Sequence, residues 1–243
     1  MRKLLVILFA LIVAVPAFSQ TAKAPAKKKK FNLANRAADH FLLQFSRDSW
    51  SGAADSVNSR IKSFSKGFNT YIMYDLPFKS DQRFSVGLGI GISTSSIGFK
   101  KTNVDIAGHT TLLAFTAVDS LDHYKKYKLA TSYLEIPLEL RFTANPDQPG
   151  KTFKIAIGAK VGTLLNAHTK GKTLQDGTGA TLSSSIDKIS TKSYFNSTRL
   201  AGTARIGYSY FSLFASYNFT TIFKDAVAPN TKLLQLGITF SGL

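Results

Sequence analysis

Apolar and non-apolar side chains alternate with a period of two residues from about residue 40 onward. A chain with this period forms β-strands with two different faces, because successive side chains of a strand point to opposite sides. Segments of about ten residues with such alternation, separated by turns, are typical of transmembrane β-barrels. The clearest segment has Leu134, Ile136, Leu138, Leu140 and Phe142 on one face and Glu135, Pro137, Glu139 and Arg141 on the other.

Seven further segments repeat this pattern, so the sequence predicts an all-β fold, an eight-stranded antiparallel up-and-down transmembrane β-barrel. An even number of strands puts both chain ends on one side of the membrane, where short turns join the strands, and leaves the longer loops on the other side. The expected strands are residues 40–49, 67–77, 83–95, 134–142, 153–163, 199–208, 211–222 and 232–240, and the expected longer loops are 50–66, 99–128, 168–196 and 223–231.

The turn at residues 145–150 is rich in Asn, Pro, Asp and Gly, which favour turns. A turn centred there predicts that Arg141 lies opposite Lys154 in the next strand. It also places Glu135 opposite Lys160, as an opposite-charge pair on the inward face of the barrel.

A secreted soluble barrel or sandwich is the competing fold. It would carry a charged outer row and large apolar side chains inside, whereas the non-apolar row here consists mainly of Gly, Ser and Ala with a few charges. Aromatic residues near the strand ends also favour the membrane barrel, because such barrels carry aromatic girdles at both interfaces. The expected girdle residues are Trp50, Tyr74, Phe78, Phe84, Tyr133, Phe142, Phe153, Tyr208, Tyr210 and Phe240.

Charged residues of both signs fall on the expected inward faces. An eight-stranded barrel has an interior just wide enough for side chains to fill, so these residues should pair and plug the lumen. A general diffusion pore is not expected, and a narrow selective channel or ligand site is the alternative interpretation. The expected lumen polar network is Asp75, Arg83, Glu135, Glu139, Arg141, Lys154, Lys160, Arg199 and Arg205.

The N-terminal residues have the order of a secretory signal peptide: a basic start, an apolar run and a small-residue exit at Ala17–Ser19. We expect residues 1–19 to be this signal peptide, in preference to an uncleaved anchor. Residues 20–39 should form a disordered periplasmic segment rich in Lys, Ala and Pro, and residues 40–243 the outer membrane β-barrel domain. Cysteine is absent, which excludes a disulfide framework and a lipid-bearing cysteine.

The net charge of +17 would suggest a nucleic-acid partner in a cytosolic protein, but export argues against one. Outer membrane lipids and other envelope proteins are the expected partners. No cofactor or metal motif is present. An outer-membrane lipid-modifying enzyme is the alternative function, but its catalytic site would need a His beside a carboxylate and a nucleophile. The sequence predicts no catalytic site, because the four histidines at 40, 109, 123 and 168 are scattered.

The segment Tyr133-Leu134-Glu135-Ile136-Pro137-Leu138 resembles a mid-barrel strand of the PorT-like outer-membrane β-barrel proteins of Bacteroidetes. The Gly-alternating strand Val86–Gly91 supports the likeness. The resemblance implies an eight-stranded barrel in the outer membrane. The even number of strands, with short turns on the inner side, independently predicts periplasmic termini. The family's namesake takes part in secretion and gliding machinery, and nothing in this sequence selects that role. We expect a structural or interaction role in the cell envelope, with the apolar loop 99–128 folding over the barrel mouth or contacting a partner.

Overall fold

The computed structural model describes residues 40–108 and 110–242. The expected signal peptide, residues 1–19, and the expected disordered segment, residues 20–39, lie outside the described residues. No helix in the described ranges has the length and apolar character needed to cross a membrane.

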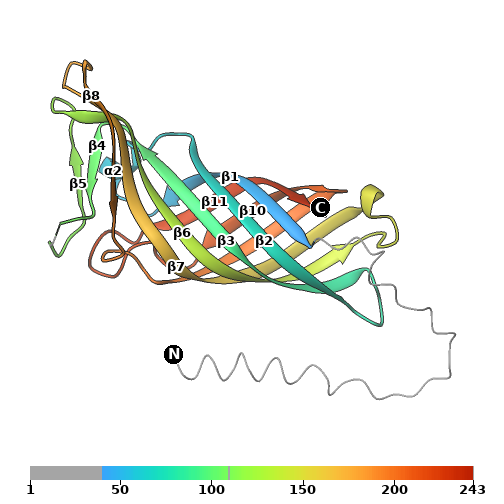
Figure 1. Ribbon diagram of the computed structural model, residues 1–243. Helices are drawn as coiled ribbons and strands as arrows, with labels where there is room; N and C mark the ends of the chain where they lie inside the picture. The colour runs from blue at the N-terminus through green and yellow to red at the C-terminus, as the bar shows by residue number, and fades with distance from the viewer. Residues whose placement is uncertain (1–39, 109, 243) are drawn as a thin grey trace, which may run out of the picture. The chain divides into compact units, whose positions relative to one another are not determined.

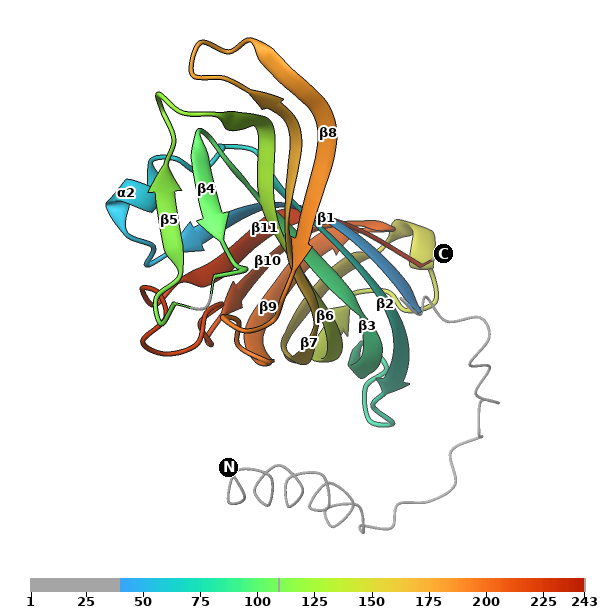
Figure 2. The ribbon, with the colours of Figure 1, turned by 60° about the vertical axis from the view of Figure 1, so that its left-hand side comes forward.

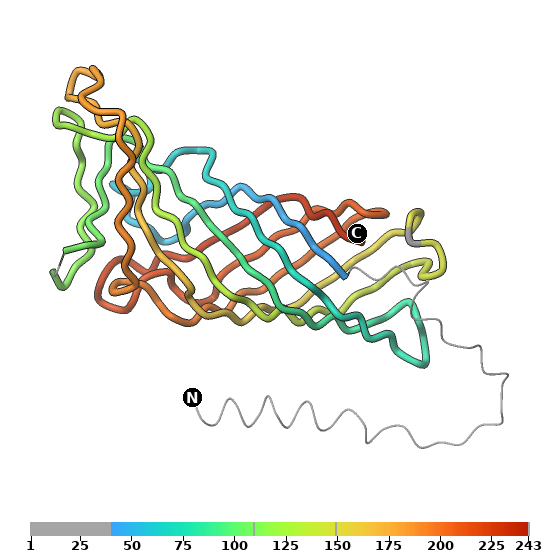
Figure 3. The backbone as a smooth tube through the Cα atoms, viewed as in Figure 1, coloured from blue at the N-terminus to red at the C-terminus, as the bar shows by residue number. Residues whose placement is uncertain are grey.

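Eight antiparallel strands close into a barrel in which each strand pairs with its neighbour in the chain (Figures 1 and 3). The first strand also pairs with the last, which together with the pairing of the two longest strands closes the barrel. The strand count and the up-and-down order agree with the sequence prediction. The barrel strands are β1 (Phe41–Ser51), β2 (Ser65–Pro77), β3 (Phe84–Phe99), β6 (His123–Thr143), β7 (Phe153–Gln175), β9 (Thr198–Tyr208), β10 (Phe211–Asn218) and β11 (Lys232–Ser241).

The two ends of the barrel differ. At the end that we call the turn end, short turns follow β2, β6 and β9. At the other, the loop end, β6 and β7 extend past the residues expected for them and form a sheet with β8 (Thr181–Ser190) (Figure 2). A hairpin of β4 (Thr102–Asp105) and β5 (Ala114–Ala117) and the short helix α2 (Asp55–Asn58) also lie in the long connections.

The expectation that residues 123–128 and 168–175 are loop was therefore wrong. Both segments are strand, and their outward positions carry Lys126, Lys128, Lys170 and Lys172. The alternation used to predict strands requires an apolar outward row, so it misses a strand whose outward side chains are basic.

The register of β6 against β7 also differs from the prediction, by two residues. The amide of Ala144 donates to the carbonyl of Phe153 at 3.0 Å, so the turn includes the 3₁₀ segment η3 (Pro149–Lys151) and is longer than expected. Because the shift is even, every side chain keeps its predicted face. The observed pairs are Glu135 with Gly162, Pro137 with Lys160, Arg141 with Ala156 and Thr143 with Lys154.

The outward face of the barrel is an exposed apolar band. Ile72 on β2 is 65% exposed and Leu213 on β10 is 64% exposed. A contiguous apolar surface of this kind is a liability in water and is compatible with hydrocarbon. Six of the expected girdle residues are exposed on this outer face or at the turn end, namely Tyr74, Phe78, Phe84, Phe153, Tyr208 and Tyr210.

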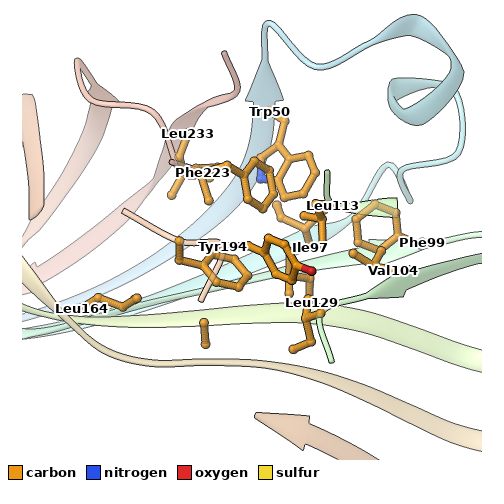
Figure 4. Packing of buried hydrophobic residues seen from close by; sticks show 14 of the residues in the cluster. Trp50, Ile97, Phe99, Val104, Leu113, Leu129, Leu164, Tyr194, Phe223 and Leu233 are labelled. Atoms are coloured by element: carbon orange, nitrogen blue, oxygen red, sulfur yellow. The ribbon is translucent and has the colours of Figure 1, made fainter. Parts of the chain in front are cut away.

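Trp50 and Tyr133 do not belong to that outer band, which corrects the girdle prediction for both. They lie at inward positions of β1 and β6 and are 7% and 4% exposed. Both enter a buried apolar cluster at the loop end, which we call the cap cluster. Figure 4 shows Trp50 within this cluster. It consists of Trp50, Ile97, Phe99, Val104, Ile106, Leu113, Tyr127, Leu129, Tyr133, Leu164, Ala167, Tyr194, Phe195, Ile222, Phe223 and Leu233.

Candidate functional site: the barrel lumen and its cap

Eight of the nine residues expected in the lumen are buried, each at most 7% exposed. They lie on inward positions of β2, β6, β7 and β9. A buried side chain on an inward position of a closed barrel lies in the lumen, because the outward positions of the same strands are exposed. The eight are Asp75, Glu135, Glu139, Arg141, Lys154, Lys160, Arg199 and Arg205.

Arg83 is the exception, and its placement in the lumen was wrong. The strand β3 begins at Phe84, so Arg83 belongs to the turn before it, where its side chain is 56% exposed. Its Nη2 lies 2.7 Å from Asp81 Oδ2. The hydrogen bonds from Arg83 lower the pKa of Asp81. The two residues form a solvent-exposed ion pair within the turn.

Glu135 is the centre of one group of lumen residues, which we call the Glu135 cluster. Its Oε1 lies 3.1 Å from Arg199 Nη1. Its Oε2 lies 3.4 Å from Lys160 Nζ and accepts a 2.6 Å hydrogen bond from the Tyr71 hydroxyl. The Glu135 side chain is fully buried, so this carboxylate is compensated by two cations and a hydroxyl in place of water.

Arg199 extends the Glu135 cluster across the lumen. From β9 its guanidinium donates to Ser93 Oγ on β3 at 3.2 Å, to Asn218 Oδ1 on β10 at 2.9 Å and to Gln235 Oε1 on β11 at 3.4 Å. It also stacks on the ring of Tyr133, 5.1 Å from the centroid. One side chain therefore contacts residues of four other strands.

Neutral polar side chains complete the ring around this level. Ser93 donates to Asn69, Asn69 donates to Gln44, and Gln44 donates to Thr239. Gln235 donates to both carboxylate oxygens of Asp48 at 3.2 Å. With the charged residues they leave no water-accessible surface on Glu135, Asn69, Ser93, Gln235 or Thr239.

A second group, the Glu139 cluster, lies nearer the turn end. Glu139 Oε2 lies 2.9 Å from Arg141 Nε and 3.0 Å from Arg205 Nη2. Asp75 approaches Arg141 at 3.6 Å. The cavity beside this cluster has a volume of about 10 Å³, room for about one water molecule.

Sequence reasoning missed Tyr71, Gln44, Asp48, Asn69 and Gln235 as members of the lumen network. All five lie on inward positions of strands that were predicted correctly. The alternation already places all five on the inward face. Four of them are neutral, so a charge pattern does not reveal them, and Asp48 lies in a strand whose alternation is weak.

The cap cluster covers the loop end of this polar lumen. Trp50 packs edge-on against Phe99 and Phe223, with each pair of centroids 5.6 Å apart. Residues of the loop 99–128 contribute to it: Leu113 and Tyr127 are buried there, whereas Leu112 and Leu121 are exposed. The expectation that this loop folds over the barrel mouth therefore holds for its buried members.

Histidine and carboxylate side chains are the candidates for catalysis or metal binding in this chain. Within the described ranges no group of three or more His, Asp or Glu side chains could hold a metal ion. The described histidines contact backbone carbonyls or an amide: His40 with Met73 O, His123 with Leu121 O, and His168 with Asn166 Nδ2. The charged residues of the lumen form ion pairs that can stabilise the barrel.

Comparison with known proteins places this geometry in context. Residues 18–225 match the family described as "Outer membrane protein beta-barrel domain". No curated protein matches the chain at a significant level.

The similar solved structures include the outer membrane protein Ail and a Neisserial surface protein. The crystal structure of Ail, the attachment invasion locus protein of Yersinia pestis, in complex with the heparin analogue sucrose octasulfate, is 16% identical, with a TM-score of 0.35, and covers 82% of this chain and 95% of Ail. The crystal structure of Neisserial surface protein A is 12% identical, with a TM-score of 0.36, and covers 83% of this chain and 97% of that protein. At these sequence identities and TM-scores, no function is inferred from the similarity.

Proposed function

Because the chain belongs to the outer membrane protein beta-barrel domain family, we propose that it is a non-conducting barrel that anchors an interaction platform in the bacterial outer membrane. The barrel supplies a rigid frame. The extended sheet and the loops at the loop end supply the contact surface. Short turns in such barrels face the periplasm, so the loop end faces the cell exterior and the termini the periplasm.

The position of Arg199 is the observation that best supports a closed lumen. Its side chain is 2% exposed and spans from β9 to β3, β6, β10 and β11. An ion moving through the barrel would have to separate this guanidinium from Glu135, and a buried ion pair is costly to break. The cap cluster adds an apolar layer above it.

Single-channel recording tests this part of the proposal. The mature protein in a planar bilayer should give no steady current, while a general diffusion porin in the same membrane does. A steady conductance in the nanosiemens range would contradict the closed lumen.

The contact surface that we assign to a partner is the edge of β8. All ten residues of β8 are exposed, and among the described strands β8 pairs only with β7. An unpaired strand edge offers backbone donors and acceptors to an extended segment of another protein. Leu182, Ile186 and Ile189 add exposed apolar side chains along the same strand. The proposed occupant is an extended segment of another envelope protein.

Site-specific photo-crosslinking in cells tests the β8 surface. A photoreactive side chain at Ile186 should yield a discrete adduct with one envelope protein, whereas the same group at Lys79, exposed at the turn end, should not. Equal adducts from both positions, or none from Ile186, would contradict the assignment.

We also propose three finer points about this chain. We assign residues 1–19 to a cleaved signal peptide, which N-terminal sequencing of the native protein tests. The Tyr133–Leu138 segment supports a PorT-like subgroup. We assign no enzymatic activity, so lipid A and phospholipid profiles should be unchanged in a deletion strain.

A further inference from the structure

Six lysines surround a groove on the outer face of the barrel near the loop end. The groove has a volume of about 690 Å³ and spans the outer face from β1 to β7. Its lining includes three phenylalanines and no Asp or Glu. The lysines are Lys62, Lys66, Lys126, Lys128, Lys170 and Lys172, and the phenylalanines are Phe45, Phe64 and Phe68.

The strand register places like charges directly opposite one another in this groove. Lys126 pairs with Lys172, and Lys128 pairs with Lys170, across β6 and β7. Lys170 also pairs with Lys188 across β7 and β8. Like charges directly opposite on one sheet face destabilise the pairing, so an anionic group bound beside these lysines would compensate their repulsion.

The described part of the chain does not supply that compensation. None of the six ammonium groups has a carboxylate of the described residues within 4.0 Å. Two of the six contact neutral oxygens: Lys128 Nζ lies 3.3 Å from Ser96 Oγ, and Lys62 Nζ lies 3.5 Å from the carbonyl of Lys125. Partial burial and the charges of Lys126 and Lys100 lower the pKa of Lys62.

The groove also has an apolar part, on the side nearer the exposed apolar band of the barrel. The rings of Phe45 and Phe68 lie 5.1 Å apart, and Lys66 Nζ lies 5.0 Å from the centroid of the Phe64 ring. A membrane strand rises about 3.3 Å per residue at a tilt of about 40°, so Phe68 and Phe78 are separated by about 25 Å along the barrel axis, the height of the apolar band. Lys66 lies about 5 Å beyond Phe68, at the level of lipid headgroups.

We propose that this groove binds a phosphorylated glycolipid of the lipid A class, with its phosphates on the lysines and an acyl chain along Phe45 and Phe68. An amphiphile matches both parts of the groove, which a free anion does not. The phosphates compensate the opposed lysine pairs, and long lysine side chains reach the headgroup level while their methylenes cover apolar surface.

Native mass spectrometry of the full mature protein in detergent tests the proposal. The probe is bisphosphorylated lipid A, compared with dephosphorylated lipid A and with phosphatidylglycerol. The quadruple variant K126Q/K128Q/K170Q/K172Q should bind the probe at least tenfold more weakly. The control K79Q/K151Q/K192Q/K224Q removes the same charge from exposed lysines outside the groove and should bind as the unchanged protein does.

A second readout separates binding from folding. Without lipid A the groove variant should lose its folded electrophoretic band at a higher temperature than the unchanged protein, because the like-charge pairs are gone. With lipid A the order should reverse.

Four results would overturn the proposal: equal loss of binding in both quadruple variants, equal binding of dephosphorylated lipid A, equal binding of phosphatidylglycerol, or a groove variant that melts lower without lipid. Displacement of the probe by an equal concentration of inorganic phosphate would assign the lysines to a free anion and also overturn it.

Discussion

Arg199 Nη1 lies 3.1 Å from Glu135 Oε1, although the two residues belong to β9 and β6, which are not neighbours in the barrel. The strand between them, β7, contributes Lys160 to the same carboxylate. Tyr71 of β2 donates a hydrogen bond to it as well, so four strands are joined through one buried anion.

Replacing Glu135 by Ala should lower the free energy of unfolding by about 3–5 kcal/mol, because Arg199 and Lys160 are left buried without their counter-charge. This is measured in lipid vesicles as the urea concentration at which half of the protein loses the electrophoretic band of the folded barrel, which heating shifts to the unfolded position. Asp81→Ala removes the exposed partner of Arg83 and should leave the midpoint unchanged. The double change Glu135→Gln and Arg199→Met should recover part of the loss. Equal effects of Glu135→Ala and Asp81→Ala would show that the lumen pair does not stabilise the barrel.

Trp50 is the single tryptophan of the chain, which makes its inward position measurable. Its fluorescence should be poorly quenched by brominated lipid acyl chains, because the indole lies among Phe99 and Phe223. The matched variant Trp50→Phe with Phe153→Trp places the indole on the exposed outer face and should be quenched strongly. Trp50→Ala should cost about 3–5 kcal/mol of stability. Strong quenching of Trp50 would show that its indole lies at the lipid interface and would contradict its inward position.

Gly91 leaves the space that Tyr71 occupies. A Cβ at this position would meet the carbonyl of Thr70 and the ring of Tyr71, so Gly91→Ala should displace the Tyr71 hydroxyl from Glu135. We expect a loss of about 1–3 kcal/mol, again measured by the urea midpoint. Gly150→Ala is the control, since the nearest atom to its new Cβ is Tyr210 Oη at 3.6 Å, an ordinary contact. A Gly91→Ala barrel as stable as the control would mean that the tyrosine moves without penalty.

Arg60 ties two loops together at the loop end through two hydrogen bonds to Asp119, of 2.9 and 2.6 Å. These bonds lower the pKa of Asp119 from 3.8. A carboxyl whose pKa is lowered on folding contributes above its unfolded pKa and loses that contribution as the pH falls through the folded value. Asp119→Asn should therefore speed amide hydrogen exchange in residues 55–62 at neutral pH, and the difference from the unchanged protein should vanish well below pH 3.8. Asp122→Asn, in the same loop, should have no effect at either pH.

Alternation was sufficient to predict the barrel, because the lipid-facing band forces a strict period of two in every strand. The same alternation assigns Trp50 and Tyr133 to the inward face, yet their aromatic character alone suggested a girdle. Position within the period was the stronger signal for both residues.

Other features depend on interactions that the local sequence does not display. The register of β6 against β7 follows from the hydrogen bond between Ala144 and Phe153, which depends on how the intervening turn folds. The extension of both strands past the membrane lacks an apolar row, since Lys128 and Lys170 occupy its outward positions. Arg83 was misplaced by the one residue that separates it from the start of β3.

The pairing of β1 with β11 joins Leu42 to Ser241 and Ser51 to Lys232, so the first strand to be synthesised finds its partner only when the last one is made. Until then two strand edges stay open, and hydrocarbon offers nothing to satisfy their backbone groups. Insertion into the bilayer must therefore await the whole chain. A product truncated before residue 232 should remain outside the membrane as a substrate for periplasmic proteases.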